Sequence, residues 1–109
     1  MARLLVYQDG QLVCSRLLDK SPLMIGRRPE NDLVLEDRTV SRKHAMIHFD
    51  EKAKCWLISN LSETNPVHVG EHRVSHPMVL FEGDEIFLGV YVIKFQEVEE
   101  TGTEAPATG

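Results

Sequence analysis

Apolar residues along this chain come in short runs that turn-forming residues interrupt about every eight to twelve positions. Residues 3–8 and 11–18 are two such runs, and Asp9-Gly10 lies between them. Asp-Gly is typical of a two-residue β-hairpin turn, because both turn positions must accept a positive φ. The first part of the chain therefore predicts a β-hairpin.

The clearest alternation of apolar and polar positions begins at residue 45, where Ala45, Ile47 and Phe49 fall on one face of a strand. We expect these three side chains in the core. Further short strands are expected at 23–25, 33–35, 55–59, 67–69, 72–74, 79–81, 85–88 and 90–95. No stretch shows a sustained helical period with capping residues. Many short strands separated by turns predict an all-β sandwich or barrel.

Length and charge indicate how the chain is organised. A chain of 109 residues fits one domain, which we expect to cover residues 1–95. Residues 96–109 are acidic and rich in Thr, Gly, Ala and Pro, so they predict a disordered tail or linker. Four of the seventeen acidic residues lie in this tail, which leaves thirteen acids and twelve bases in the domain. This balance argues against a general nucleic-acid binder.

The two cysteines, Cys14 and Cys55, match no metal or redox spacing. Both lie in strand-like runs, so we expect buried free thiols, although a disulfide between them stays open. No apolar run approaches the ~20 residues of a membrane span, and residues 4–6 are too short for the apolar part of a signal peptide. We therefore expect a protein that does not use a membrane and is cytoplasmic, or nuclear if its source is eukaryotic.

Basic residues are concentrated in residues 25–44, which hold five of the twelve Lys and Arg residues. The dipeptide Gly26-Arg27 ends one apolar run, and Ser41 with two following cations precedes the strand at residue 45. Loops on either side of a brief strand can converge at one end of a sheet. Guanidinium groups and a hydroxyl displayed there suit a doubly charged phosphate ester.

Several separated motifs occur in one order along the chain: IGRRPENDLVL, VSRKHAMI, WLISNLSETN, VGEHRV and FEGDEIFLG. Together they resemble the forkhead-associated (FHA) domain, a phosphothreonine-binding β-sandwich, from about Leu5 to Phe95. The resemblance implies two largely antiparallel sheets with the binding loops at one end. It also implies a non-catalytic module that binds phosphothreonine peptides in Ser/Thr kinase signalling.

The same resemblance assigns roles to five residues of this chain. Arg27 and the hydroxyl of Ser41 are expected to bond the phosphate, and Arg42 matches a position that often adds a further phosphate contact. Thr64 matches a residue that lines the phosphothreonine pocket. Asn65 matches the asparagine whose carboxamide bonds the peptide backbone beside the phosphothreonine.

Two further residues are expected to support the site. Gly26 permits the turn, and the imidazole of His44 is expected to be buried and to brace the binding loops. One departure from the family is Pro66-Val67, where Gly-Thr is frequent. Because proline fixes φ and lacks an N–H, we expect a stiffer loop at this point.

Two other chemistries are less consistent with the sequence. Ser41 and His44 suggest a nucleophile and a base, but no third member accompanies them, and the cations beside the serine suit anion binding. The histidines His68, His72 and His76 recur every four residues, but in strands such a gap spans about 13 Å. We therefore expect no catalysis, no metal and no cofactor.

The expected partner is a protein or peptide that carries phosphothreonine. Thr101, Thr103 and Thr108 lie among acidic residues of the tail, and after phosphorylation one of them could bind the domain of another copy or of its own chain. The alternative from a different class is a phosphate-independent interaction or self-association domain that uses a face of a sheet.

Overall fold

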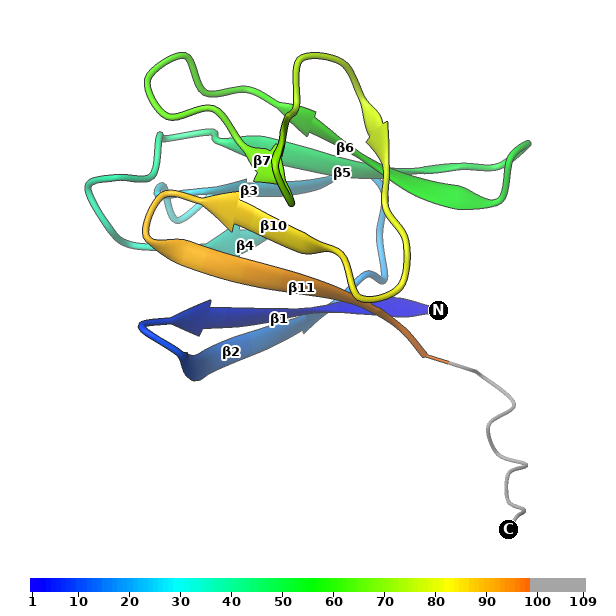
Figure 1. Cartoon of the computed structure of the whole chain (residues 1–109), viewed down its shortest axis with the longest axis horizontal. Helices are drawn as coiled ribbons and strands as arrows, with labels where there is room; N and C mark the ends of the chain where they lie inside the picture. Colours follow the sequence, from blue (N-terminus) through cyan, green and yellow to red (C-terminus); the bar gives the residue numbers. More distant parts are fainter. Residues whose placement is uncertain (99–109) are drawn as a thin grey trace, which may run out of the picture.

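The computed structural model describes residues 1–98 and arranges them in two β-sheets that pack face to face (Figure 1). The six-stranded sheet has the order β2 (Gln11–Leu17), β1 (Ala2–Gln8), β11 (Tyr91–Glu97), β10 (Glu85–Leu88), β7 (His68–Val69) and β8 (His72–Arg73). The five-stranded sheet has the order β4 (Leu33–Val34), β3 (Leu23–Gly26), β5 (Ala45–Asp50), β6 (Cys55–Asn60) and β9 (Met78–Val79). Among these pairs only β3 and β4 are parallel. The expected all-β sandwich is therefore confirmed.

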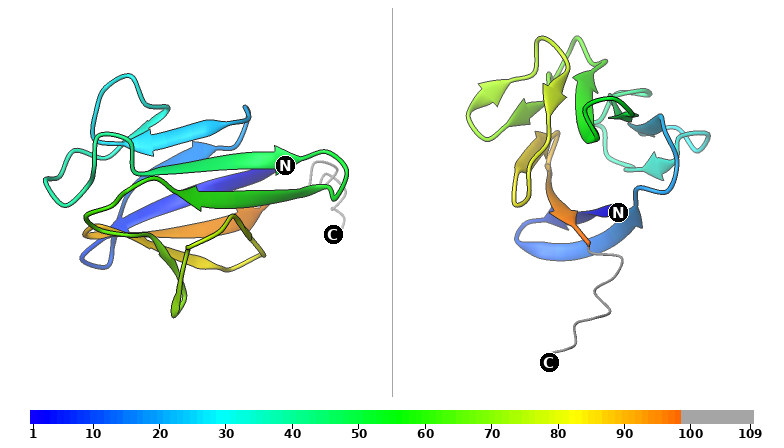
Figure 2. Two further views of the ribbon diagram at one scale, coloured as in Figure 1. Left: turned by 90° about the horizontal axis from the view of Figure 1, so that it is seen from above. Right: turned by 90° about the vertical axis from the view of Figure 1, so that its right-hand side faces the viewer.

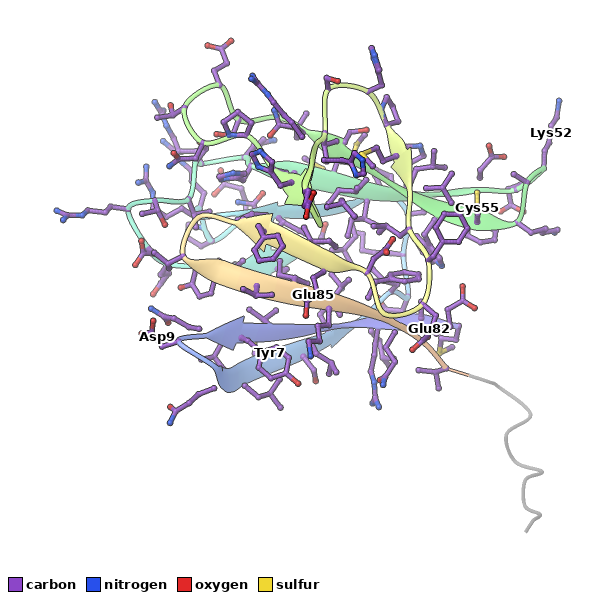
Figure 3. The ribbon with its side chains drawn as sticks, in the orientation of Figure 1. Tyr7, Asp9, Lys52, Cys55, Glu82 and Glu85 are labelled. Atoms are coloured by element: carbon purple, nitrogen blue, oxygen red, sulfur yellow. The ribbon has the colours of Figure 1, made fainter. Side chains whose placement is uncertain are left out.

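The predicted hairpin at the start of the chain is also confirmed. Asp9 and Gly10 form its turn with φ values of 53° and 79°, and Asp9 is labelled at this turn in Figure 3. β1 then pairs on its other side with β11, with Val6 opposite Ile93. The first and last described strands thus lie side by side within one sheet, which ties the two ends of the domain together.

The core lies between the sheets and is built from the inward-facing positions of their strands. Ile47 and Ile58 are paired across β5 and β6, and both are completely buried. Ile86, Ile93 and Phe95 are completely buried on the facing sheet. Burying one such side chain contributes roughly 1.5–3 kcal/mol. The inward-facing apolar positions of the two sheets therefore form a single shared core.

One predicted core residue is placed differently by the structure. Ala45 and Ile47 are completely buried as expected, but Phe49 is only half-buried. Its ring packs edge-on against Trp56, with 5.1 Å between the ring centroids. The hairpin between β5 and β6 extends past the facing sheet, as the position of Lys52 shows in Figure 3. The alternation is correct, but the facing sheet does not reach far enough to cover this position.

The two thiols are free and half-buried, so the disulfide that the sequence left open does not form. Burial raises the pKa of the Cys14 thiol above its usual value. The strand β11 continues to Glu97, two residues beyond the expected domain boundary, and most of the predicted tail lies outside the described residues. Residues 1–98 contain no helix with the length and apolar character of a membrane span.

Several loops gather at one end of the sandwich. The connections β3–β4, β4–β5 and β6–β7 lie at the left in Figure 1 and again in the left view of Figure 2. The N-terminus lies at the opposite end, where the backbone N–H of Val98 donates to the carbonyl of Met1. The β-sandwich therefore presents three loops together, away from both ends of the described chain.

Gly26 allows two of these loops to approach each other closely. A Cβ atom at this position would overlap the carbonyl oxygen of Arg42 and lie 2.6 Å from Nδ2 of Asn31. We expect Gly26→Ala to lower the free energy of unfolding by about 1–3 kcal/mol, because packed backbone must move to admit the methyl group. Urea denaturation measures this loss. The exposed substitution Ser75→Ala serves as the control, with an expected change within ~0.5 kcal/mol. A Gly26→Ala variant as stable as this control would contradict the close approach.

Candidate functional site

The three gathered loops surround a shallow depression with a volume of about 420 Å³. It is lined by Arg27, Arg38, Thr39, Val40, Ser41, Arg42, Lys43, Glu63, Thr64 and Asn65. All five residues expected to contact a ligand are therefore brought together, although they lie up to 38 positions apart, between Arg27 and Asn65. Gly26 and His44, the two expected supports, are buried next to this lining.

The charge of the depression is strongly positive. Four cationic side chains line it, namely Arg27, Arg38, Arg42 and Lys43, against the single carboxylate of Glu63. Within residues 1–98 none of the four cations makes a side-chain hydrogen bond or an ion pair. Because the whole chain has a net charge of −5, this group of unpaired cations is a local exception. It leaves several donors available to an anionic ligand.

Asn31 holds the two arginine-bearing segments together. Its side-chain Nδ2 donates to the carbonyl of Arg28 at 2.9 Å and to the carbonyl of Arg42 at 2.8 Å. The backbone N–H of Arg27 donates to the carbonyl of Ser41 at 3.0 Å, which adds a second link. Asn31 is buried, and nothing in the local sequence pattern distinguished it from an ordinary turn residue. Its role depends on a partner eleven residues away.

His44 forms a bridge between the β4–β5 and β6–β7 loops. Its ring is completely buried; the backbone N–H of Ser41 donates to Nδ1 at 2.9 Å, and Nε2 lies 2.6 Å from the carbonyl oxygen of Asn65. Since an N–H can only donate, Nδ1 is the acceptor, and Nε2 carries the proton and donates to Asn65. The bridge therefore requires the neutral imidazole with its proton on Nε2.

The environment of His44 favours this neutral form. Burial lowers the pKa of the imidazole below its ordinary value of about 6.5, and the hydrogen bond to the Asn65 carbonyl opposes this shift only in part. The same geometry excludes a nucleophile–base pair, because neither ring nitrogen faces the hydroxyl of Ser41. One nitrogen accepts from a backbone N–H and the other faces a carbonyl.

A second bridge joins the same two loops through Ser62. Its Oγ lies 2.7 Å from Oγ of Ser41 and accepts a hydrogen bond from the backbone N–H of Asn65 at 3.1 Å. Asn60 fixes the backbone of Ser62, accepting from its N–H at 3.2 Å and donating to its carbonyl at 2.8 Å. Ser62 and Asn60 were not among the residues that the sequence assigned to the site. A loop has no periodicity that would reveal which of its residues is buried.

The side chain of Asn65 is partly engaged within the domain. Its Nδ2 donates to the carbonyl of Thr39 at 2.9 Å, and Asn65 itself is exposed. Thr39 is held in turn by the carboxylate of Asp37 at 2.8 Å and by the backbone N–H of Val90 at 3.0 Å. No residue among 1–98 donates to Oδ1 of Asn65. This oxygen can therefore accept a hydrogen bond from the backbone of an extended ligand.

The remaining sequence expectations concern the edges of the site. Thr64 is exposed on its rim. Arg38 and Lys43, which were not among the residues expected to contact a ligand, also line the depression. Arg28 does not line it and pairs with Glu30 at 3.7 Å. Across residues 1–98, no three His, Cys, Asp or Glu side chains are grouped as a metal site.

Comparisons with known proteins agree with this geometry. Residues 23–89 match the family described as FHA domain. The glycogen accumulation regulator GarA of Mycobacterium tuberculosis is 32% identical over 107 residues, which cover 97% of this chain and 64% of that protein. The oxoglutarate dehydrogenase inhibitor of Corynebacterium jeikeium is 34% identical over 93 residues, covering 84% of this chain and 62% of that protein. The chain thus spans less than two thirds of the length of these relatives.

Solved structures show the same fold. An FHA domain studied for phosphothreonine-dependent interactions superposes with a TM-score of 0.77 at 27% identity, covering 90% of this chain and 97% of that one. EmbR of Mycobacterium tuberculosis, in complex with a low-affinity phosphopeptide, superposes with a TM-score of 0.75 at 33% identity. That match covers 87% of this chain and 24% of EmbR.

The neutral state of His44 predicts how stability depends on pH. The unfolded chain binds a proton near pH 6.5, whereas the folded chain binds it only at a lower pH. The contribution of the neutral ring is therefore complete above about pH 6.5 and is lost as the pH falls through the lower folded pKa. We expect NMR titration to show the His44 ring still neutral where an ordinary histidine is protonated.

Chemical denaturation at several pH values provides the second measurement. His44→Asn should unfold more easily at neutral pH and should lose part of the decline in stability below pH 6.5. Substitution of the exposed His76 by Gln is the control and should keep that decline. If wild type and His44→Asn lose stability in parallel as the pH falls, the neutral bridge is not what holds the loops.

Proposed function

Because the chain belongs to the FHA domain family, we propose that it is a non-catalytic module that binds proteins and peptides carrying phosphothreonine. The observation that carries this proposal is the group of unpaired cations around the hydroxyl of Ser41, beside a carboxamide oxygen with no donor within residues 1–98. Charge alone would attract any anion. The combination of cations, hydroxyl and carboxamide is suited to a phosphate ester attached to a peptide backbone.

The phosphate half of the site consists of Arg27, Ser41 and Arg42. A phosphothreonine brings a charge of about −1.5 to −2 and three acceptor oxygens at neutral pH. Each hydrogen bond to such a charged group contributes roughly 1.5–3 kcal/mol. Arg38 and Lys43 add long-range attraction from the same rim. Salt should therefore weaken binding, because exposed charges are screened within about 10 Å at 0.1 M.

The peptide half of the site consists of Thr64 and Asn65. Oδ1 of Asn65 accepts an N–H from the residue beside the phosphothreonine, while its Nδ2 stays bonded to Thr39. Thr64 lines the depression, and we assign to it the contact with the methyl group that distinguishes phosphothreonine from phosphoserine. One methyl contact contributes only about 1 kcal/mol, so a preference based on area alone is moderate.

The cellular role proposed is to recruit a partner after a Ser/Thr kinase has acted, in the cytoplasm. GarA and EmbR are described as regulators, but the chain covers only part of each, so their activities are not transferred to it. The tail threonines Thr101, Thr103 and Thr108 lie outside the described residues, and their binding in trans stays a prediction. The end of β11 lies opposite the site, which favours another copy over the same chain.

Calorimetry with matched threonine, phosphoserine and phosphothreonine peptides tests the proposal. We expect binding only to the phosphorylated forms, with phosphothreonine preferred. Arg27→Ala and Ser41→Ala should each weaken binding by about tenfold or more, because each removes a hydrogen bond to a charged group. Arg28→Ala is the matched control: the same substitution one position later, at a side chain that pairs with Glu30 and does not line the site.

Equal binding to threonine and phosphothreonine peptides would contradict recognition of the phosphate. It would favour the alternative, a phosphate-independent interaction through a face of a sheet. The same holds for a phosphate preference that Arg27→Ala leaves intact. Raising the salt concentration should weaken the wild-type interaction more than that of Arg27→Ala, because the variant has one fewer charge to be screened.

A further inference from the structure

Ser62 is a buried serine in the β6–β7 loop, and only 3% of its surface is exposed. It lies beneath Ser41, the residue whose hydroxyl is proposed to meet the phosphate. We propose that Ser62 is a positioning residue: its hydroxyl donates to Ser41 and so turns the proton of Ser41 toward the ligand. This inference rests on the proposed phosphothreonine binding and adds a residue to the same site.

The direction of the Ser41–Ser62 hydrogen bond follows from counting protons. Oγ of Ser62 has two neighbours within residues 1–98, the backbone N–H of Asn65 at 3.1 Å and Oγ of Ser41 at 2.7 Å. The N–H of Asn65 can only donate, so it occupies a lone pair of Ser62. The single proton of Ser62 then has one acceptor, which is Ser41. The proton of Ser41 is left free.

The reverse direction leaves a buried donor unsatisfied. If Ser41 donated, Ser62 would accept two hydrogen bonds, and its own proton would have no acceptor among the described residues. Buried polar hydrogens without a partner are rare, because they lose their hydrogen bonds to water without replacement. Ser41 is only half-buried and lines the depression, so its proton can be satisfied by water or by a ligand.

Ser62 cannot easily turn away from this contact. Its backbone is held on both sides by the carboxamide of Asn60, at 2.8 Å and 3.2 Å. The same Oδ1 atom of Asn60 also accepts from the N–H of Val67 at 3.1 Å, which fixes the far side of the loop. The hydroxyl of Ser62 is therefore presented to Ser41 by a rigid support before any ligand arrives.

The consequence concerns what the phosphate meets when it enters. Each phosphate oxygen is an acceptor and needs a donor. If the Ser41 hydroxyl donated its proton to Ser62, only its lone pairs would face the anion. With Ser62 as the donor, Ser41 is prepared as a donor and loses little freedom on binding. The geometry thus lets the hydroxyl of Ser62, one residue before Glu63, influence the binding of a phosphate that it does not touch.

A double-mutant cycle on phosphothreonine-peptide affinity tests this arrangement. We expect Ser62→Ala to weaken binding by about three- to tenfold, the effect of one ordinary hydrogen bond. In a Ser41→Ala background the same substitution should change affinity by less than about twofold, because Ser62 acts through Ser41. Ser75→Ala, at an exposed serine outside the site, is the control and should leave affinity unchanged.

A loss that persists in the Ser41→Ala background would overturn the inference, since it would mean that Ser62 acts by holding the Asn65 backbone. An unchanged affinity for Ser62→Ala would also overturn it. Ser62→Cys keeps a side chain of similar shape with a weak donor, so its affinity should lie between those of wild type and Ser62→Ala. If Ser62→Ala is poorly folded, Ser62→Cys takes its place in the cycle, and its affinity should be lower than that of wild type. Wild-type protein that fails to bind any phosphothreonine peptide would reject the proposed function itself, which the calorimetry above detects separately.

Discussion

The site depends on one buried imidazole. His44 accepts from the N–H of Ser41 and donates to the carbonyl of Asn65, so it joins the loop that carries the charges to the loop that carries the carboxamide. Ser62 links the same two residues a second time, through Oγ of Ser41 and the N–H of Asn65. Two bridges between one pair of residues restrict both the distance and the relative rotation of the loops. A ligand that needs both loops therefore finds them already placed.

This constraint works because the sandwich delivers the loops to the same end. Antiparallel pairing of β3, β5 and β6 brings Gly26 and Asn60, at the ends of β3 and β6, next to the start of β5 at one end of the five-stranded sheet. The completely buried residues of both sheets hold these strand ends in place. Gly26 then lets the backbone of Arg42 approach, and Asn31 fastens the two segments. Hydrogen bonds at these strand ends therefore connect the loops of the site to the β-sandwich.

Much of the fold could be predicted from local patterns. Alternation identified β5, and Asp9-Gly10 identified the first hairpin, because strand and turn residues act within a few positions. Phe49 was misplaced because its burial depends on how far the opposite sheet extends, which no local pattern records. Five of the ten lining residues could be named through a family resemblance across several motifs. Ser62 could not, because its function depends on a serine 21 positions earlier and on burial within a loop.

The neutral His44 has a consequence for how the module responds to acidity. Burial lowers the pKa of the His44 imidazole, so the ring that bridges the loops stays uncharged near neutral pH and adds no charge to the site. The proposed ligand does titrate in this range, because the second ionisation of a phosphothreonine lies near pH 6. Affinity should therefore follow the ionisation of the partner. The pH dependence of binding is therefore expected to come from the phosphothreonine and not from His44.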